Sequence, residues 1–87
     1  MRVLVADDDP TYLALLESLL TEWNYEVVLA CDGNEAWSIM QAPDRPSLVI
    51  LDWMMPGLDG FGLARMIRCD PNSQGAYVLL VTGTRNR

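Results

Sequence analysis

The sequence contains no lysine and no histidine, so arginine supplies all six of its basic side chains. Twelve aspartate and glutamate residues outnumber them and leave a net charge of −6. Proteins that bind nucleic acids neutralise the phosphates with clustered basic side chains. Direct binding to DNA or RNA is therefore not expected of this chain.

Cysteine and long apolar runs are also scarce. Cys31 and Cys69 are too few for a disulfide framework, and without histidine they do not form a usual zinc site. We expect both to be free thiols in a reducing cytoplasm. No apolar run approaches the length of a membrane span, and the start of the chain is not typical of a signal peptide. The sequence thus predicts a cytoplasmic protein without membrane contact.

What is present is an alternation of short apolar runs and helical patterns within 87 residues, enough for one small domain. Strand-like runs occupy 3–6, 25–30, 47–51 and 77–82, and helical patterns begin at Pro10 and cover about 34–41 and 61–68. Helices between strands this short require parallel pairing through right-handed crossovers. We therefore expect an α/β fold in which helices cover both faces of a small parallel sheet.

Several residues predict where the first helix starts and ends and which side chains the helices bury. Asp9 is expected to cap the first helix ahead of Pro10, and Asn24 to end it in the left-handed conformation. Its apolar positions recur at three- and four-residue spacing and are expected in the core: Tyr12, Leu15, Leu16, Leu19, Leu20 and Trp23. The corresponding positions of the later helices are Ala36, Trp37, Met40, Phe61, Ala64 and Ile67.

Carboxylates follow two of the strand-like runs. Asp7, Asp8 and Asp9 come directly after the first run. Asp52 comes directly after the third, and because sites form at the carboxyl ends of parallel strands, we expect it to lie beside the first group. Clustered carboxylates repel one another unless a cation neutralises them. Oxygen ligands without histidine or cysteine suit Mg²⁺, which the sequence therefore predicts at this edge.

The most specific feature of the sequence is the run at 51–60, Leu-Asp-Trp-Met-Met-Pro-Gly-Leu-Asp-Gly. An ionisable carboxylate ends an apolar strand, and proline-glycine and aspartate-glycine pairs then turn the chain. This run resembles the phosphoacceptor strand and following loop of response-regulator receiver domains, and the likeness extends over residues 3–84. The resemblance implies a flavodoxin-like, doubly wound sheet of four strands in the order 2-1-3-4, with three helices.

The same resemblance implies a role for each residue of the site. Asp52 would be the phosphorylated residue, and Asp7 and Asp8 match the paired acids that hold a divalent cation, Mg²⁺ or Mn²⁺. The backbone carbonyl of Met54 would complete the protein ligands. The hydroxyl of Thr82, at the end of the fourth strand, would bond a phosphoryl oxygen.

The resemblance also implies a partner and a reaction. A sensor histidine kinase or a phosphotransfer protein would donate a phosphoryl group to Asp52, as in two-component signalling. The domain would assist its own phosphorylation and act as a switch rather than as an enzyme.

Family domains continue beyond the fourth strand with a fourth helix, a fifth strand that ends in a lysine, and a fifth helix. Residues 1–87 are therefore expected to form the N-terminal portion of a single receiver domain, and the absence of that lysine is expected to slow phosphorylation. The uncovered fourth strand would offer unpaired backbone groups with no lysine or proline to blunt the edge. We expect a homodimer, joined through this edge or by exchanged elements.

Two other functions are alternatives. Residues 7–11 also match Asp-x-Asp-x-Thr, the nucleophile motif of haloacid-dehalogenase-type phosphatases, with Asp7 as nucleophile and Asp9 as general acid and base. Short motifs of this kind often match by chance. The second alternative is an interaction module whose carboxylates take no part in phosphoryl chemistry. Covalent labelling of Asp52 would support a receiver, whereas labelling of Asp7 would support a phosphatase.

Overall fold

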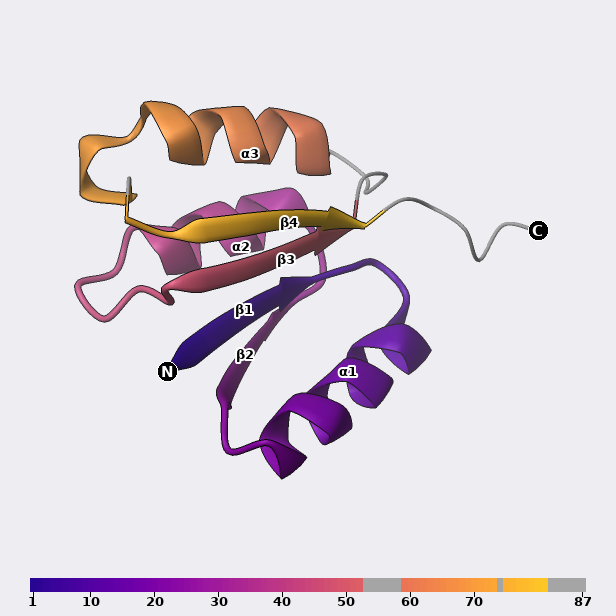
Figure 1. Ribbon diagram of the computed structural model, residues 1–87. Helices are drawn as coiled ribbons and strands as arrows, with labels where there is room; N and C mark the ends of the chain where they lie inside the picture. The colour runs from indigo at the N-terminus through magenta and orange to yellow at the C-terminus, as the bar shows by residue number, and fades with distance from the viewer. Residues whose placement is uncertain (53–58, 74, 82–87) are drawn as a thin grey trace.

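The computed structural model of the chain describes residues 1–52, 59–73 and 75–81. Strands and helices alternate along these residues (Figure 1). The elements are β1 (Arg2–Ala6), α1 (Pro10–Glu22), β2 (Glu26–Ala30), α2 (Gly33–Met40), β3 (Leu48–Asp52), α3 (Gly60–Cys69), the 3₁₀ helix η1 (Pro71–Ser73) and β4 (Tyr77–Val81). The predicted alternation is confirmed.

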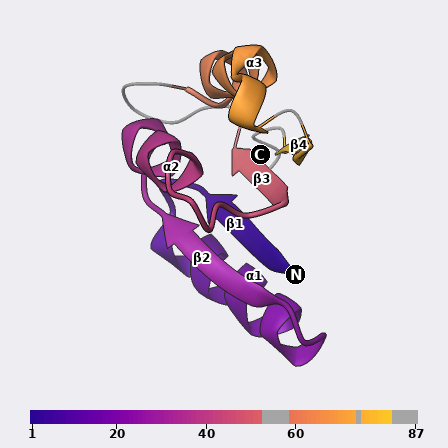
Figure 2. The ribbon, with the colours of Figure 1, turned by 90° about the vertical axis from the view of Figure 1, so that its left-hand side faces the viewer.

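The four strands form one parallel sheet in the order β2-β1-β3-β4. Helix α1 lies on one face of the sheet, and α2 and α3 lie on the other (Figure 2). The predicted α/β class, the strand order 2-1-3-4 and the cover by helices on both faces are all confirmed. Because β1 and β3 are the two central strands, the residues at their carboxyl ends lie side by side in the middle of the row of strand ends.

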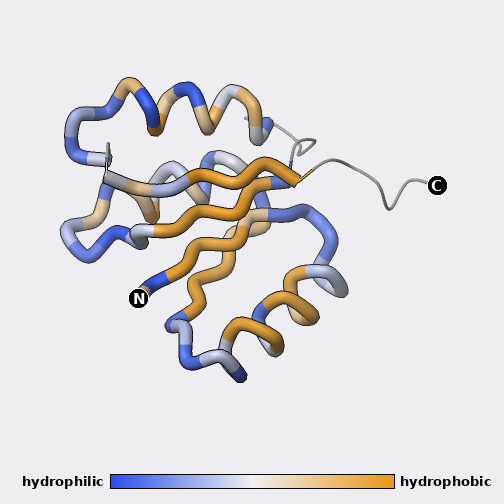
Figure 3. The backbone as a smooth tube through the Cα atoms, viewed as in Figure 1, coloured by the Kyte–Doolittle hydropathy of each residue, from blue (hydrophilic) through white to orange (hydrophobic). Residues whose placement is uncertain are grey.

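Alternate residues of the central strands enter two separate hydrophobic clusters, one on each face. Val5 of β1 belongs to a cluster with Leu13 of α1. Its neighbour Leu4 belongs to a larger cluster with Met40 of α2 and Leu63 of α3. The strands are hydrophobic along most of their length (Figure 3), as expected of a parallel sheet that is buried on both faces.

The predicted ends of α1 are confirmed. The carboxylate of Asp9 accepts a hydrogen bond from the backbone N–H of Thr11 at 3.0 Å, and Pro10 lies in the first turn. Asn24, just beyond the helix, has a φ of 70°, in the left-handed region that asparagine tolerates. Both signals are local, so the sequence alone was enough to place them.

The other two helices also start at aspartates, which the sequence analysis did not assign as caps. Asp32 accepts a hydrogen bond from the backbone N–H of Glu35 at 2.8 Å. Asp59 accepts one from the backbone N–H of Gly62, also at 2.8 Å. Each carboxylate satisfies an N–H that has no partner within its helix.

The predicted burial is partly wrong for the first helix and for Phe61 of α3. Trp23 is 66% exposed, and Leu15, Leu19 and Phe61 are also exposed rather than in the core. Helix α1 contacts β1 and β2, and its apolar stripe is wider than the surface that these two strands offer. Leu13, which the predicted set omitted, is buried instead.

For α2 and the remainder of α3 the predicted burial is confirmed. Ala36, Met40 and Ile67 are fully buried, and Trp37 and Ala64 pack against them in the larger cluster.

Asp70 joins the ends of α2, α3 and η1. Its carboxylate accepts hydrogen bonds from the backbone N–H of Asn72 at 3.1 Å, the hydroxyl of Ser73 at 3.1 Å and the side-chain amide of Gln41 at 3.2 Å. The hydrogen bond from Asn72 is the main reason that the pKa of Asp70 lies below its ordinary value of 3.8.

Two further sequence predictions can be compared with the structure. Cys31 and Cys69 are exposed free thiols, as expected. Among the described residues, no helix is both long enough and apolar enough to cross a bilayer.

Candidate functional site

Two neighbouring strands bring the predicted carboxylates to one edge of the sheet. Ala6 of β1 lies opposite Leu51 of β3 in the parallel register. Asp7 is the residue after Ala6, and Asp52 follows Leu51 as the last residue of β3. This register carries both carboxylates to the carboxyl ends of adjacent strands, where open α/β sheets form their sites.

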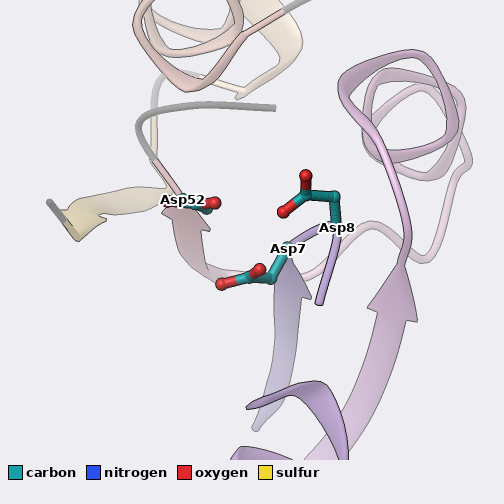
Figure 4. A group of neighbouring side chains, drawn as sticks. All are labelled: Asp7, Asp8 and Asp52. Atoms are coloured by element: carbon teal, nitrogen blue, oxygen red, sulfur yellow. The ribbon is translucent and has the colours of Figure 1, made fainter. Parts of the chain in front are cut away.

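Asp7, Asp8 and Asp52 form a compact group. One carboxylate oxygen from each lies within 4.8 Å of the others. Asp7 and Asp52 are only 1% and 2% exposed, whereas Asp8 is open to solvent. Figure 4 shows the three side chains converging on a shared space. Asp7 and Asp52 therefore form the buried part of the group, and Asp8 forms the part that is accessible to solvent.

Hydrogen bonds in the turn after β1 orient the first of these carboxylates. The backbone N–H of Asp7 donates to the carbonyl of Ala30 on β2 at 3.1 Å. The Oδ1 atom of Asp7 accepts from the backbone N–H of Asp9 at 2.9 Å. Asp9 uses its own carboxylate to cap α1, so it is not part of the group.

The donor set fits a hard divalent cation. Three carboxylates at this separation repel one another, and a cation between them removes that repulsion. All three side chains offer oxygen, with neither histidine nor cysteine in the group, which suits Mg²⁺ rather than a softer metal. Mg²⁺ usually keeps several waters, and the exposed side of the group gives them room.

The structure thus brings together three of the five residues that the sequence predicted for the site, Asp7, Asp8 and Asp52. Met54 and Thr82 lie outside the described residues. No described member of the group was missed, because Asp7 and Asp8 are the first two residues after β1 and Asp52 is the last residue of β3.

Comparison with known protein families identifies the fold. Residues 3–87 match the response regulator receiver domain. The chain belongs to the receiver-domain family. The predicted receiver-domain family is confirmed, and members of this family of two-component signalling domains typically act as signalling modules rather than as enzymes.

Individual relatives agree with this assignment. Response regulator PleD from Caulobacter vibrioides is 43% identical to the receiver chain over 86 residues, which are 99% of this chain and 19% of PleD. The receiver domain of a signal transduction histidine kinase from Syntrophus aciditrophicus superposes with a TM-score of 0.88 at 32% identity, over 93% of this chain and 61% of that one. Response regulator TrrA from Thermotoga maritima, solved in complex with Mg(2+)-BeF, has a TM-score of 0.85 at 37% identity, over 99% of this chain and 73% of TrrA. The receiver chain therefore spans about a fifth of the length of PleD.

The phosphatase alternative does not agree with these findings. Its mechanism needs Asp9 as general acid and base, but the carboxylate of Asp9 caps α1. The family match over residues 3–87 also assigns the chain elsewhere.

Proposed function

We propose that this receiver domain accepts a phosphoryl group on the carboxylate of Asp52 and thereby acts as a signalling switch. The observation that carries the proposal is the group of three carboxylates at the ends of β1 and β3, with Asp52 almost fully buried. Burial of a carboxylate is unfavourable unless a cation or a reaction uses it. The position of Asp52 at the carboxyl end of a central strand is where such a reaction would occur.

In the proposed reaction a carboxylate oxygen of Asp52 attacks the phosphorus atom of the donor, opposite the bond that breaks. With a phosphohistidine donor, the phosphorus–nitrogen bond breaks, its electron pair stays on the imidazole, and the imidazole takes up a proton from solvent. The product is an acyl phosphate on Asp52. Asp52 acts as the nucleophile, and its nearly complete burial limits the access of water, which would compete with the carboxylate for the phosphoryl group.

The proposed ligands for Mg²⁺ or Mn²⁺ are the carboxylates of Asp8 and Asp52 and the backbone carbonyl of Met54, with Asp7 acting mainly through water. A bound divalent cation neutralises negative charge on the phosphoryl oxygens. TrrA, which was solved with Mg(2+)-BeF, supports this assignment by family likeness.

Thr82 is proposed to bond a phosphoryl oxygen through its hydroxyl. Asp52 pairs with Val81 across β3 and β4, and Thr82 is the next residue of the chain. The register therefore supports a hydroxyl close to the phosphorylated carboxylate.

The proposed donor is a sensor histidine kinase or a phosphotransfer protein, as is usual for receiver domains. A small acyl phosphate such as acetyl phosphate should also serve, because the receiver residues themselves orient the nucleophile.

A homodimer formed through the β4 edge or by exchanged elements also stays a prediction.

Phosphorylation is tested by incubating the protein with acetyl phosphate and Mg²⁺ and measuring the intact mass. We expect one added phosphoryl group that hydroxylamine removes, because hydroxylamine cleaves acyl phosphates. Labelling should be slow, since the chain contains no lysine to pair with the phosphoryl group.

Two variants make this test specific. Asp52→Asn should remain unlabelled. Asp9→Asn should label like the parent chain, because asparagine caps a helix as well as aspartate does and Asp9 lies outside the carboxylate group. Labelling that persists in Asp52→Asn would contradict the proposal.

A further inference from the structure

Two aspartate side chains close two consecutive turns between β1 and α1. The Oδ1 atom of Asp7 accepts a hydrogen bond from the backbone N–H of Asp9 at 2.9 Å. The Oδ1 atom of Asp9 in turn accepts one from the backbone N–H of Thr11 at 3.0 Å. Each bond links an aspartate to the N–H two residues further on, which is the pattern of an Asx turn. Asp9 therefore donates to a carboxylate of the site and also caps the helix that follows.

The sheet holds the backbone of Asp7. Its N–H donates to the carbonyl of Ala30 at 3.1 Å, one residue beyond the last pair of the β1–β2 register, Ala6 and Ala30. With the backbone held in this way, the orientation of the carboxylate depends on rotation about the side-chain bonds. The hydrogen bond from Asp9 restricts that rotation.

The donor residue is itself held by the start of α1. Asp9 has φ −98° and ψ 109°, an extended conformation that the following Pro10 favours. The carbonyl of Asp9 accepts a hydrogen bond from the backbone N–H of Leu13 at 3.1 Å, within the first turn of the helix. The backbone of Asp9 is thus joined to α1 on one side and bonded to the Asp7 carboxylate on the other.

We propose that Asp9 is a positioning residue of the cation site, and that it acts through its backbone N–H rather than through its charge. This N–H holds the Asp7 carboxylate in the orientation in which it meets the carboxylates of Asp8 and Asp52 (Figure 4). The inference rests on the proposed function, because it concerns the same cation.

Orientation matters here because of the geometry that Mg²⁺ requires. Mg²⁺ binds with near-ideal octahedral geometry and keeps several of its waters. Asp7 is proposed to act mainly through such a water, so a rotated carboxylate would move the water away from its octahedral position. Loss of a group that orients a metal ligand typically lowers metal affinity by about 10–100-fold.

Three substitutions of Asp9 separate its backbone N–H from its side chain. Asp9→Asn keeps both the N–H and a capping oxygen. Asp9→Ala keeps the N–H and loses the capping oxygen. Asp9→Pro loses both, and the observed φ of −98° is near enough to the value of about −65° that proline prefers for a small adjustment to suffice.

The measurements are isothermal titration calorimetry with Mg²⁺ and urea unfolding in metal-free buffer. Asp9→Ala and Asp9→Pro should both be less stable than the parent chain, because both lose the cap of α1. Only Asp9→Pro should bind Mg²⁺ more weakly, by about tenfold, whereas Asp9→Asn and Asp9→Ala should bind it like the parent chain. A purely structural role of Asp9 would change stability and leave the affinity unchanged.

A pair of backbone esters gives the same comparison if Asp9→Pro does not fold. Residues 1–30 can be synthesised and joined to residues 31–87 by chemical ligation at Cys31. An ester in place of the N–H of Asp9 removes the bond to Asp7, and an ester in place of the N–H of Thr11 removes the bond to Asp9. We expect about tenfold weaker Mg²⁺ binding for the first ester only, relative to a ligated chain with all its amides.

The outcomes distinguish this inference from the proposed function. A folded Asp9→Pro variant, or an Asp9 ester, that binds Mg²⁺ like the parent chain overturns the inference and leaves the cation site standing. Equal weakening by Asp9→Ala and Asp9→Pro, or by the two esters, also overturns it, because the cap would then be responsible. A parent chain that binds no Mg²⁺ overturns the cation site itself, and the inference with it.

Discussion

Asp7 and Asp52 are the only charged side chains that are buried among the described residues. Elsewhere in that part of the chain, the acidic side chains lie at the surface, and three of them cap helices. A buried carboxylate loses its hydration, and a second one nearby adds repulsion. At the level of single residues, the carboxylate group is therefore where stability and function are in conflict.

The first prediction concerns the cation site. Asp7→Asn combined with Asp8→Asn removes two of the three negative charges and should abolish Mg²⁺ binding in the millimolar range, because the remaining carboxylate offers a single anionic ligand. Isothermal titration calorimetry measures the affinity. Asp9→Asn is the control, since it removes a charge two residues from Asp7 yet keeps the cap of α1. An unchanged Mg²⁺ affinity in the double variant would refute the assigned ligands.

At the level of elements, helix ends position the site and connect the layers. The cap at Asp9 starts α1 directly after the carboxylate turn, and the backbone N–H of the same residue holds the Asp7 side chain. At the opposite end of the sheet, Asp70 connects α2 to α3 and η1 through three hydrogen bonds. Each junction is held by hydrogen bonds to the carboxylate of an aspartate.

The second prediction is a pH dependence at the Asp70 junction. Its hydrogen bonds favour the ionised carboxylate, so its pKa is lower in the folded chain than in the unfolded one. The resulting stabilisation is fully present above the ordinary pKa of 3.8 and is lost as the pH falls through the lower, folded pKa. Asp70→Asn should therefore be less stable than the parent chain at neutral pH, and the difference should vanish in acid. Urea unfolding of both proteins at a series of pH values measures this, and a difference independent of pH would contradict it.

For the whole molecule, the carboxylate group lowers stability when no cation is bound. Two unit charges within 4.8 Å of each other repel by on the order of 3 kcal/mol or more at an effective dielectric constant near 20. A domain of this size has a total stability of only about 5–10 kcal/mol, so the group is a large perturbation. Such a cost is common where a site must keep unfavourable chemistry in place.

The third prediction follows from that repulsion. Without divalent cations, Asp52→Asn should raise the free energy of unfolding by about 1–3 kcal/mol, because it removes one buried charge and keeps the shape of the side chain. Added Mg²⁺ should stabilise the parent chain more than the variant. At a Mg²⁺ concentration ten times the dissociation constant, the stabilisation of the parent chain should be about 1.4 kcal/mol. Chemical unfolding with and without Mg²⁺ tests both statements. A variant less stable than the parent in metal-free buffer would show that repulsion is not the dominant effect.

Much of the fold and the described site could be predicted from local sequence patterns. The apolar runs and the aspartate, proline and asparagine residues at helix ends act through their nearest neighbours, so Asp9, Pro10 and Asn24 were placed correctly. The carboxylates of Asp7 and Asp52 follow or end buried strands, and strand ends meet once the sheet is parallel. The run at 51–60 then identified the receiver family directly.

Which of the apolar side chains are buried depended on the tertiary structure. Trp23, Leu15 and Leu19 satisfy the helical spacing of a buried stripe, yet they are exposed, because among the described elements α1 packs mainly on β1 and β2. Spacing fixes which side chains share a face of a helix, but the number and position of neighbouring elements decide how much of that face is covered. The same reason explains β4: its sequence determined a strand, whereas only the assembled sheet showed that β4 pairs with β3 and that Leu79 and Leu80 are exposed.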